Sequence, residues 1–201
     1  MKRVLFLLPF LAMTIVATTA PAEGPGVGDK VPDTQLRGAD GERVGLRALV
    51  DGQPAVLVFY RGGWCPFCTK HLAGMAGIHD EVRENGFQVL AISPDRPAKL
   101  AETPDRESLG YRLLSDSTME TARAFGIAFQ VPADLVRKYK EEFGIDLEAD
   151  SGQTHHLLPH PAVYVVAGDG SILFAHVNED YRERLDPDKV LEAVAEAAQV
   201  K

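Results

Sequence analysis

Residues 59–70 read Phe-Tyr-Arg-Gly-Gly-Trp-Cys-Pro-Phe-Cys-Thr-Lys and contain both cysteines of the chain, Cys65 and Cys68. The preceding residues 54–60 are a continuous run of apolar residues, which predicts a buried strand of a parallel sheet. Residues 69–84 lack proline and place apolar side chains at a period of 3.6, which predicts a helix. The glycines allow a sharp turn, and the proline between the cysteines suits a first helical turn. Cys65 is therefore expected at or near a helix N-cap, with Cys68 one turn along.

This placement suits thiol redox chemistry. Residues three apart on a helix face each other, so Cys65 and Cys68 can close a disulfide or open to a dithiol without refolding. The helix N-terminus and the nearby cations Arg61 and Lys70 favour a thiolate, which lowers a cysteine pKa from about 8.5 toward about 3.5 to 7.5. Two alternatives stay open: a structural disulfide, or half of a zinc site, although the chain has no second CxxC pair. We interpret the pair as a redox-active dithiol.

The whole-chain composition narrows the function classes. A chain of 201 residues suits one domain, and 45% hydrophobic with 25% charged residues is ordinary globular composition. The formal net charge of −8 argues against binding to nucleic acid, because phosphate contacts need a basic face. It argues equally against an anionic membrane surface.

The N-terminus has the features of a secretory signal peptide. A cationic head, Met1-Lys2-Arg3, precedes an apolar stretch at residues 4–17 and a small-x-small cleavage motif, Ala20-Pro21-Ala22. The apolar stretch is shorter than the roughly 20 residues that span a bilayer, although a retained signal anchor is the alternative. We expect cleavage after Ala22 and a mature domain at residues 23–201 that is periplasmic or extracellular and free of the membrane. In that oxidising compartment a CxxC pair can form a disulfide.

The remaining chain alternates strand and helix patterns around one interruption. Residues 128–150 break the alternation with a strongly charged helical pattern, which we interpret as an insertion with a solvated face. The other expected elements are a hairpin at 31–44, a helical turn at 46–49, strands at 87–93, 111–114, 162–167 and 171–175, and helices at 94–102, 118–125 and 187–200.

This order of elements resembles the thioredoxin fold. The lead-in at 27–33, the core at 59–68, Leu113-Leu114-Ser115-Asp116 and Phe125-Gly126-Ile127 are similar to the peroxiredoxin-like branch of the alkyl hydroperoxide reductase and thiol-specific antioxidant (AhpC/TSA) family. The resemblance covers about residues 26 to 198. It implies an α/β fold with a central mixed sheet flanked by helices, an N-terminal hairpin and a helical insertion.

Two matches of the motif imply different roles for the cysteines. In the match to thioredoxin, Cys65, which follows Trp64, is the solvent-exposed attacking thiol, and Cys68 is the resolving thiol. Matched to peroxiredoxins, Cys68 followed by Thr69 attacks the peroxide, and Cys65 stands where those enzymes keep a threonine or serine. In the second match Arg61 replaces a proline and would supply the positive charge at the peroxide.

The thioredoxin match also implies roles for the residues before the late strand. It implies that Pro161 is a cis proline packed against the CxxC pair and that His160 faces the sulfurs, where an imidazole could stabilise a thiolate or pass a proton. In the peroxiredoxin match, Pro161 stands in the place of an arginine. Another interpretation gives His160 a plain loop position.

The resemblance implies an exported thiol-dependent antioxidant enzyme that reduces hydroperoxides through a Cys65/Cys68 dithiol–disulfide cycle. Catalytic roles fall to Cys65, Cys68 and Arg61, with support from Trp64, Thr69, His160 and Pro161. The expected partners are a hydroperoxide or disulfide substrate and a thiol reductant such as a thioredoxin-like protein, with no cofactor and no metal. The alternatives are a thiol:disulfide oxidoreductase with Cys65 as nucleophile, a copper-handling protein on the same fold, and a non-enzymatic binding module.

Overall fold

The computed structural model describes residues 24–103 and 108–199. The strands span Gln35–Arg37 (β1), Arg43–Gly45 (β2), Ala55–Phe59 (β3), Gln88–Ser93 (β4), Arg112–Ser115 (β5), Ala128–Gln130 (β6), Leu157–Pro159 (β7), Ala162–Val166 (β8) and Ile172–Val177 (β9). The helices span Leu46–Val50 (α1), Pro66–Gly77 (α2), His79–Glu84 (α3), Pro97–Ala101 (α4), Glu120–Ala124 (α5), Ala133–Phe143 (α6), Leu147–Ser151 (α7) and Pro187–Ala198 (α8). The predicted signal peptide at 1–22 lies outside the described residues. Of the helices in the described part, none is long and apolar enough to cross a membrane.

The main sheet is mixed and runs in the order β2-β1-β5-β4-β3-β8-β9 within the described residues. Strand β4 pairs in parallel with β3 and β5, whereas β8 and β9 join the opposite side of β3 in antiparallel register. The hairpin β1–β2 pairs antiparallel at the far edge. The predicted α/β fold with a central mixed sheet and an N-terminal hairpin is confirmed.

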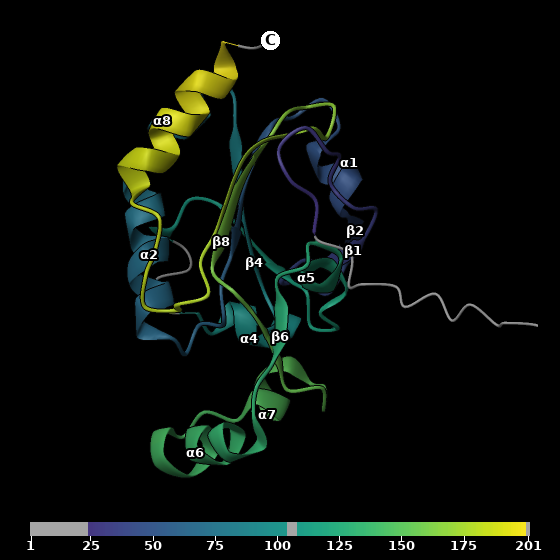
Figure 1. The fold of residues 1–201 in the computed structure, drawn as a ribbon, viewed down its shortest axis with the longest axis vertical. Helices are drawn as coiled ribbons and strands as arrows, with labels where there is room; N and C mark the ends of the chain where they lie inside the picture. The colour runs from purple at the N-terminus through teal and green to yellow at the C-terminus, as the bar shows by residue number, and fades with distance from the viewer. Residues whose placement is uncertain (1–23, 104–107, 200–201) are drawn as a thin grey trace, which may run out of the picture.

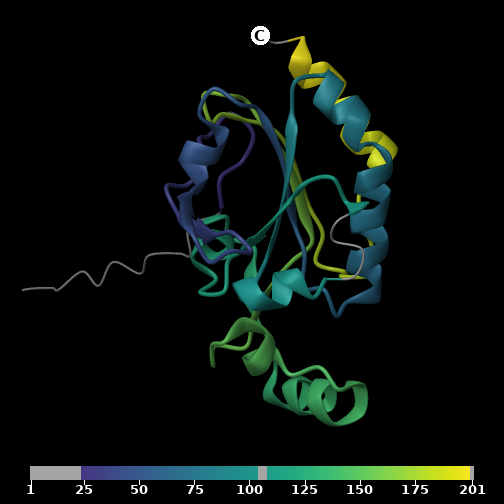
Figure 2. The same cartoon turned by 180° about the vertical axis from the view of Figure 1, so that it is seen from behind.

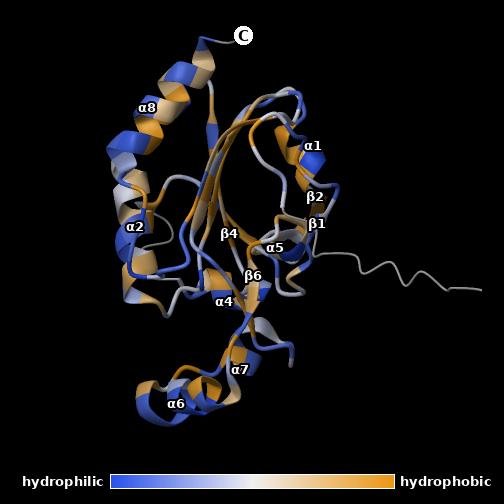
Figure 3. Cartoon of the chain, in the orientation of Figure 1, coloured by the Kyte–Doolittle hydropathy of each residue, from blue (hydrophilic) through white to orange (hydrophobic). Residues whose placement is uncertain are grey.

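Helices cover both faces of this sheet. Helices α2 and α8 lie on one face, and α1 and α5 lie on the other (Figures 1 and 2). Strand β3 serves both layers because successive side chains alternate: Val56 and Val58 belong to the first cluster, and Leu57 and Phe59 to the second. The central strands are therefore apolar along their whole length, whereas α8 has one apolar and one polar side (Figure 3).

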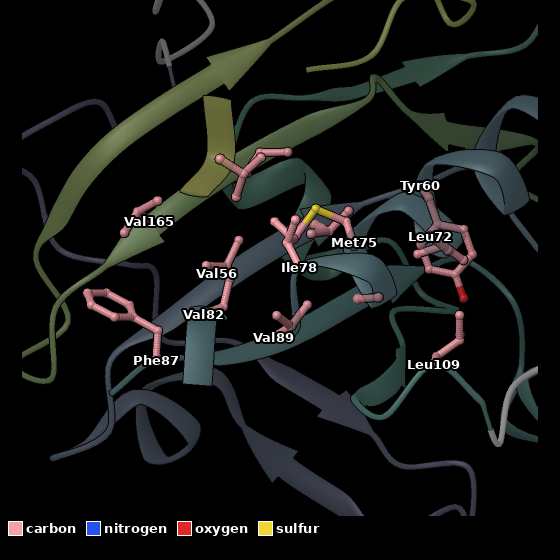
Figure 4. Packing of buried hydrophobic residues seen from close by; sticks show 14 of the residues in the cluster. Val56, Tyr60, Leu72, Met75, Ile78, Val82, Phe87, Val89, Leu109 and Val165 are labelled. Carbon is pink, nitrogen blue, oxygen red and sulfur yellow. The ribbon is translucent and has the colours of Figure 1, made fainter. Parts of the chain in front are cut away.

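The layer against α2 and α8 fixes the position of the cysteine helix. Leu72 and Met75 of α2 are buried against strand residues that include Val56 and Val89 (Figure 4). Full burial of each such side chain contributes about 1.5 to 3 kcal/mol to the free energy of folding. Helix α2 therefore cannot shift along the sheet without losing this packing.

The structure corrects the predicted cysteine helix in one respect. Residues 69–84 do not form one helix, because α2 already begins at Pro66 and the chain breaks at Ile78, whose φ and ψ are −107° and 4°. Gly77 precedes the break, and glycine and β-branched residues are weak helix formers. The segment predicted as a helical insertion at 128–150 contains α6 and α7, which extend beyond one end of the sheet (Figure 1). Its strand β6 pairs with β7, which follows the segment, and no pattern predicted either strand.

Candidate functional site

The turn between β3 and α2 is fixed by backbone geometry. Gly62 has φ of 145°, and a Cβ there would lie 2.4 Å from Nε1 of Trp64, so only glycine fits. The backbone N–H of Gly63 donates to Oδ2 of Asp95 at 2.8 Å. Asp95, which sequence reasoning missed, follows β4 and is buried, and its burial raises the pKa of this carboxyl to about 6. The turn is thus tied to the end of the neighbouring strand.

This turn delivers the two cysteines to the start of α2. Cys65 is the N-cap residue and Pro66 the first helical residue, as predicted. The carbonyl of Cys65 accepts from the N–H of Cys68 at 2.9 Å and from that of Thr69 at 3.0 Å. Both cysteines are free thiols, with exposed fractions of 2% for Cys65 and 0% for Cys68. The expectation that solvent reaches Cys65 is wrong, because Cys65 packs in the apolar cluster between the sheet and helices α2 and α8.

The two thiols interact directly and titrate together. A hydrogen bond with Cys68 lowers the pKa of Cys65 to about 6, and the charges of Arg61 and Arg184 act in the same direction. Burial raises the pKa of Cys68 above its ordinary value. At neutral pH the pair therefore carries one negative charge, which lies mainly on Cys65, and one shared proton.

Arg61 is a buried cation enclosed by aromatic rings. Its guanidinium carbon lies 5.2 Å from the ring centre of Trp64, 5.6 Å from that of Tyr139 and 4.3 Å from that of Tyr181. One of its Nη atoms donates to the hydroxyl of Tyr139. Arg61 and Trp64 belong to the cysteine segment itself, whereas the two tyrosines come from α6 and from the loop after β9. Charge over aromatic faces stabilises a guanidinium that water cannot reach.

A second cation, Arg184, reaches the cysteines from a distant part of the chain. Its Nη2 lies 3.3 Å from Sγ of Cys68, across 116 residues of sequence. Lys70, which the sequence offered as the second local cation, is exposed on α2 instead. Sequence reasoning missed Arg184 because its loop shows no periodicity and no spacing that relates it to the CxxC pair.

The segment before β8 differs from the thioredoxin expectation. No peptide bond among the described residues is cis, so the predicted cis Pro161 is wrong. The N–H of His160 donates to the carbonyl of Ile127, and the carbonyl of Pro161 accepts from Asn178, which ties both sides of the trans bond to neighbouring segments. The ring of His160 stacks on that of Phe129 with 4.6 Å between ring centres, and its buried Nδ1 has no hydrogen-bond partner among the described residues.

Thr69 and the possible metal site are the remaining features that the sequence analysis considered. The hydroxyl of Thr69 donates to the carbonyl of Pro66 at 3.0 Å, within the first turn of α2. In the described ranges, no group of three or more His, Cys, Asp or Glu side chains is arranged to hold a metal ion. The copper-handling alternative therefore finds no ligand set in this part of the chain.

Comparison with known proteins places this geometry in context. The AhpC/TSA family model matches residues 27–175. Peroxiredoxin Bcp of Escherichia coli K12 is 29% identical over 171 residues, which cover 85% of this chain and 96% of that protein. Peroxidoxin BcpB of Mycobacterium tuberculosis has a TM-score of 0.65 at 23% identity, covering 85% of this chain and 97% of the other. Reduced Prx3 of Vibrio vulnificus, solved in complex with H₂O₂, has a TM-score of 0.69 at 15% identity, covering 85% and 99%.

Proposed function

Because the chain belongs to the AhpC/TSA family and is a peroxiredoxin-like oxidoreductase, we propose that it reduces hydroperoxides through a dithiol–disulfide cycle of Cys65 and Cys68. The observation that carries the proposal is the burial of two hydrogen-bonded thiols one helical turn apart. A protein disulfide would need contact with an exposed sulfur, whereas a small hydroperoxide needs only a narrow path. Burial of both sulfurs therefore favours a small oxidant.

Cys68 is the proposed attacking sulfur. The proton shared by the pair moves to Cys65, and the Cys68 thiolate attacks one oxygen of the hydroperoxide. The S–O bond forms as the O–O bond breaks, which leaves a sulfenic acid on Cys68. The departing alkoxide takes the proton from Cys65 and leaves as an alcohol, or as water when the oxidant is H₂O₂.

Cys65 is the proposed resolving sulfur. With a pKa of about 6 it is a thiolate once it has given up the proton, so it attacks the Cys68 sulfenic acid. The S–S bond forms, hydroxide leaves, and a solvent proton converts it to water. One hydroperoxide and two thiols thus yield an alcohol, a water and a disulfide. A thiol reductant such as a thioredoxin-like protein then restores the dithiol by exchange.

A second candidate function rests on the same low pKa. A Cys65 thiolate at a helix N-cap is the nucleophile that a thiol:disulfide oxidoreductase needs. In that case Cys68 resolves the mixed disulfide, and the turn must open so that Cys65 can reach a protein substrate. The two functions assign opposite roles to the same two atoms.

We also propose that the protein is exported, which the N-terminal sequence supports. In an oxidising compartment the disulfide form would accumulate unless a dedicated reductant is present. The peroxide substrate, by contrast, is small and neutral and reaches such a compartment freely.

Single-cysteine variants separate the two functions. In reduced Cys65→Ser the departing oxygen takes its proton from solvent. We still expect this variant to react with H₂O₂ in stopped flow at least about 100-fold faster than free cysteine, the size of effect that positioned donors give. Mass spectrometry with dimedone should then find a sulfenic acid on Cys68. Cys68→Ser, the matched control, should react no faster than free cysteine. A slow Cys65→Ser variant beside a fast Cys68→Ser variant would transfer the attack to Cys65 and favour the second function.

A further inference from the structure

The loop at residues 178–186, between β9 and α8, holds a cation against the attacking sulfur. Its Arg184 places Nη2 3.3 Å from Sγ of Cys68 and is half-buried. Arg184 forms no ion pair with a carboxylate in the described part of the chain. Arg182 of the same loop is different, since it is exposed and pairs with Asp180 at 2.7 Å. The charge of Arg184 is therefore available to the cysteine pair.

Hydrogen bonds within the loop hold this guanidinium in place. Nη1 of Arg184 donates to the backbone carbonyls of Tyr181 and Glu183, the latter at 2.8 Å. The ring of Tyr181 lies 4.3 Å from the guanidinium carbon of Arg61 and packs edge-on against Phe67 at 5.8 Å between ring centres. The loop is thus fastened to the segment that carries the cysteines. Its arginine is held in place before any substrate arrives.

One nitrogen of Arg184 remains free for a substrate oxygen. Its buried Nε makes no hydrogen bond within the described protein, and neither does the buried Nε2 of His71. Both side chains line a cavity of about 10 Å³ together with Pro161, His176, Asn178 and Glu183, and this volume is close to the space that one water-sized group needs. Burial lowers the pKa of His71 to about 4, so this ring is neutral at neutral pH, whereas Glu183 brings a carboxylate to the same cavity.

We propose that Arg184 is a catalytic residue of the peroxide step, which draws the shared negative charge onto Cys68 and hydrogen-bonds the hydroperoxide. This inference rests on the proposed function. A guanidinium presents five donors in a fixed plane, so Nη2 can contact the thiolate while Nε contacts an oxygen. The negative charge that develops on the departing oxygen as the O–O bond breaks then meets a fixed cation. Arg184 itself keeps its protons, because the departing oxygen is protonated by Cys65.

The test uses the reduced Cys65→Ser protein as the parent, so that Cys68 is the only thiol whose alkylation and oxidation are measured. Arg184→Gln should raise the midpoint of the pH profile of iodoacetamide alkylation and slow the reaction with H₂O₂ by about 100-fold. Arg182→Gln removes the same charge from the same loop. It should leave the alkylation midpoint unchanged and the rate within about twofold of the parent's rate. Near-UV circular dichroism checks that each variant is folded. A folded Arg184→Gln variant with the midpoint and rate of the parent overturns the proposal.

Two further outcomes distinguish the sources of failure. If the parent itself reacts with H₂O₂ no faster than free cysteine, the proposed function fails, and the role of Arg184 fails with it. If the parent is fast and Arg184→Gln is equally fast, only the role of Arg184 fails. Arg184→Lys covers the case in which Arg184→Gln does not fold: it should keep the alkylation midpoint but lose about tenfold in rate, because an ammonium lacks the planar fork. An unchanged rate in Arg184→Lys would contradict the proposal.

Discussion

Arg61 is a buried charge that contributes to the low pKa of Cys65. The hydrogen bond with Cys68 is the largest cause of the low pKa of Cys65, and the positive charge of Arg61 acts in the same direction, so removing this charge must raise that pKa. We expect Arg61→Met, which keeps the length of the stem, to raise the midpoint of Cys65 alkylation by about one pH unit. Peptide-resolved mass spectrometry of iodoacetamide labelling across pH measures this midpoint.

Lys70 provides the matched control for this residue. It is a cation of the same segment but is exposed to solvent on α2. Lys70→Met should therefore shift the midpoint by less than about 0.3 units, because solvent and salt screen an exposed charge. Equal midpoints for the two variants would show that Arg61 holds the segment together without tuning the thiol.

The insertion acts on the site as a structural element. Its helix α6 supplies Tyr139, whose hydroxyl accepts a hydrogen bond from Arg61 and whose ring lies 5.8 Å from that of Trp64. Trp64 in turn packs against the small apolar cluster that the insertion forms with β7, which includes Leu147 and Leu158. The insertion therefore stabilises the turn that carries the cysteines.

We expect Tyr139→Phe to lower the free energy of unfolding by about 1 to 2 kcal/mol, since it leaves a buried guanidinium without its acceptor. Urea denaturation of the reduced protein measures this change. Phe143→Leu on the same helix is the control, because Phe143 is 58% exposed and its replacement should cost less than about 0.5 kcal/mol. Indistinguishable midpoints for the two variants would rule out a contribution from the Tyr139 hydroxyl.

At the scale of the whole molecule, the proposed export is open to a direct measurement. When the full sequence is expressed in a bacterial host with a periplasm, we expect the intact mass of the exported protein to correspond to a chain that begins at Glu23. Replacing Leu8 by arginine interrupts the apolar stretch and should leave the uncleaved precursor in the cytoplasm. An exported chain that still begins at Met1 would instead favour a retained signal anchor.

The sequence by itself determined the elements that depend on local interactions. The apolar run of β3 and the placement of Cys65 at the N-cap of α2 follow from sterics and hydrogen bonding within a few residues. The hairpin β1–β2 and the closing helix α8 follow for the same reason, from turn residues and from apolar periodicity. Trp64 and Arg61 were found at the site because they belong to the same short segment as the cysteines.

Only the tertiary structure decided what surrounds the sulfurs. Arg184 lies 116 residues from Cys68, and Tyr139 lies 78 residues from Arg61, so no local pattern connects them. The burial of Cys65 in the main apolar cluster, and the hydrogen bonds that hold His160 and Pro161, likewise involve segments distant in the sequence. Loops carry no periodic signal, and the path of the chain through space fixes their contacts. For that reason the cysteine pair and Arg61 can be identified from the sequence, whereas Arg184 and the tyrosines that surround Arg61 cannot.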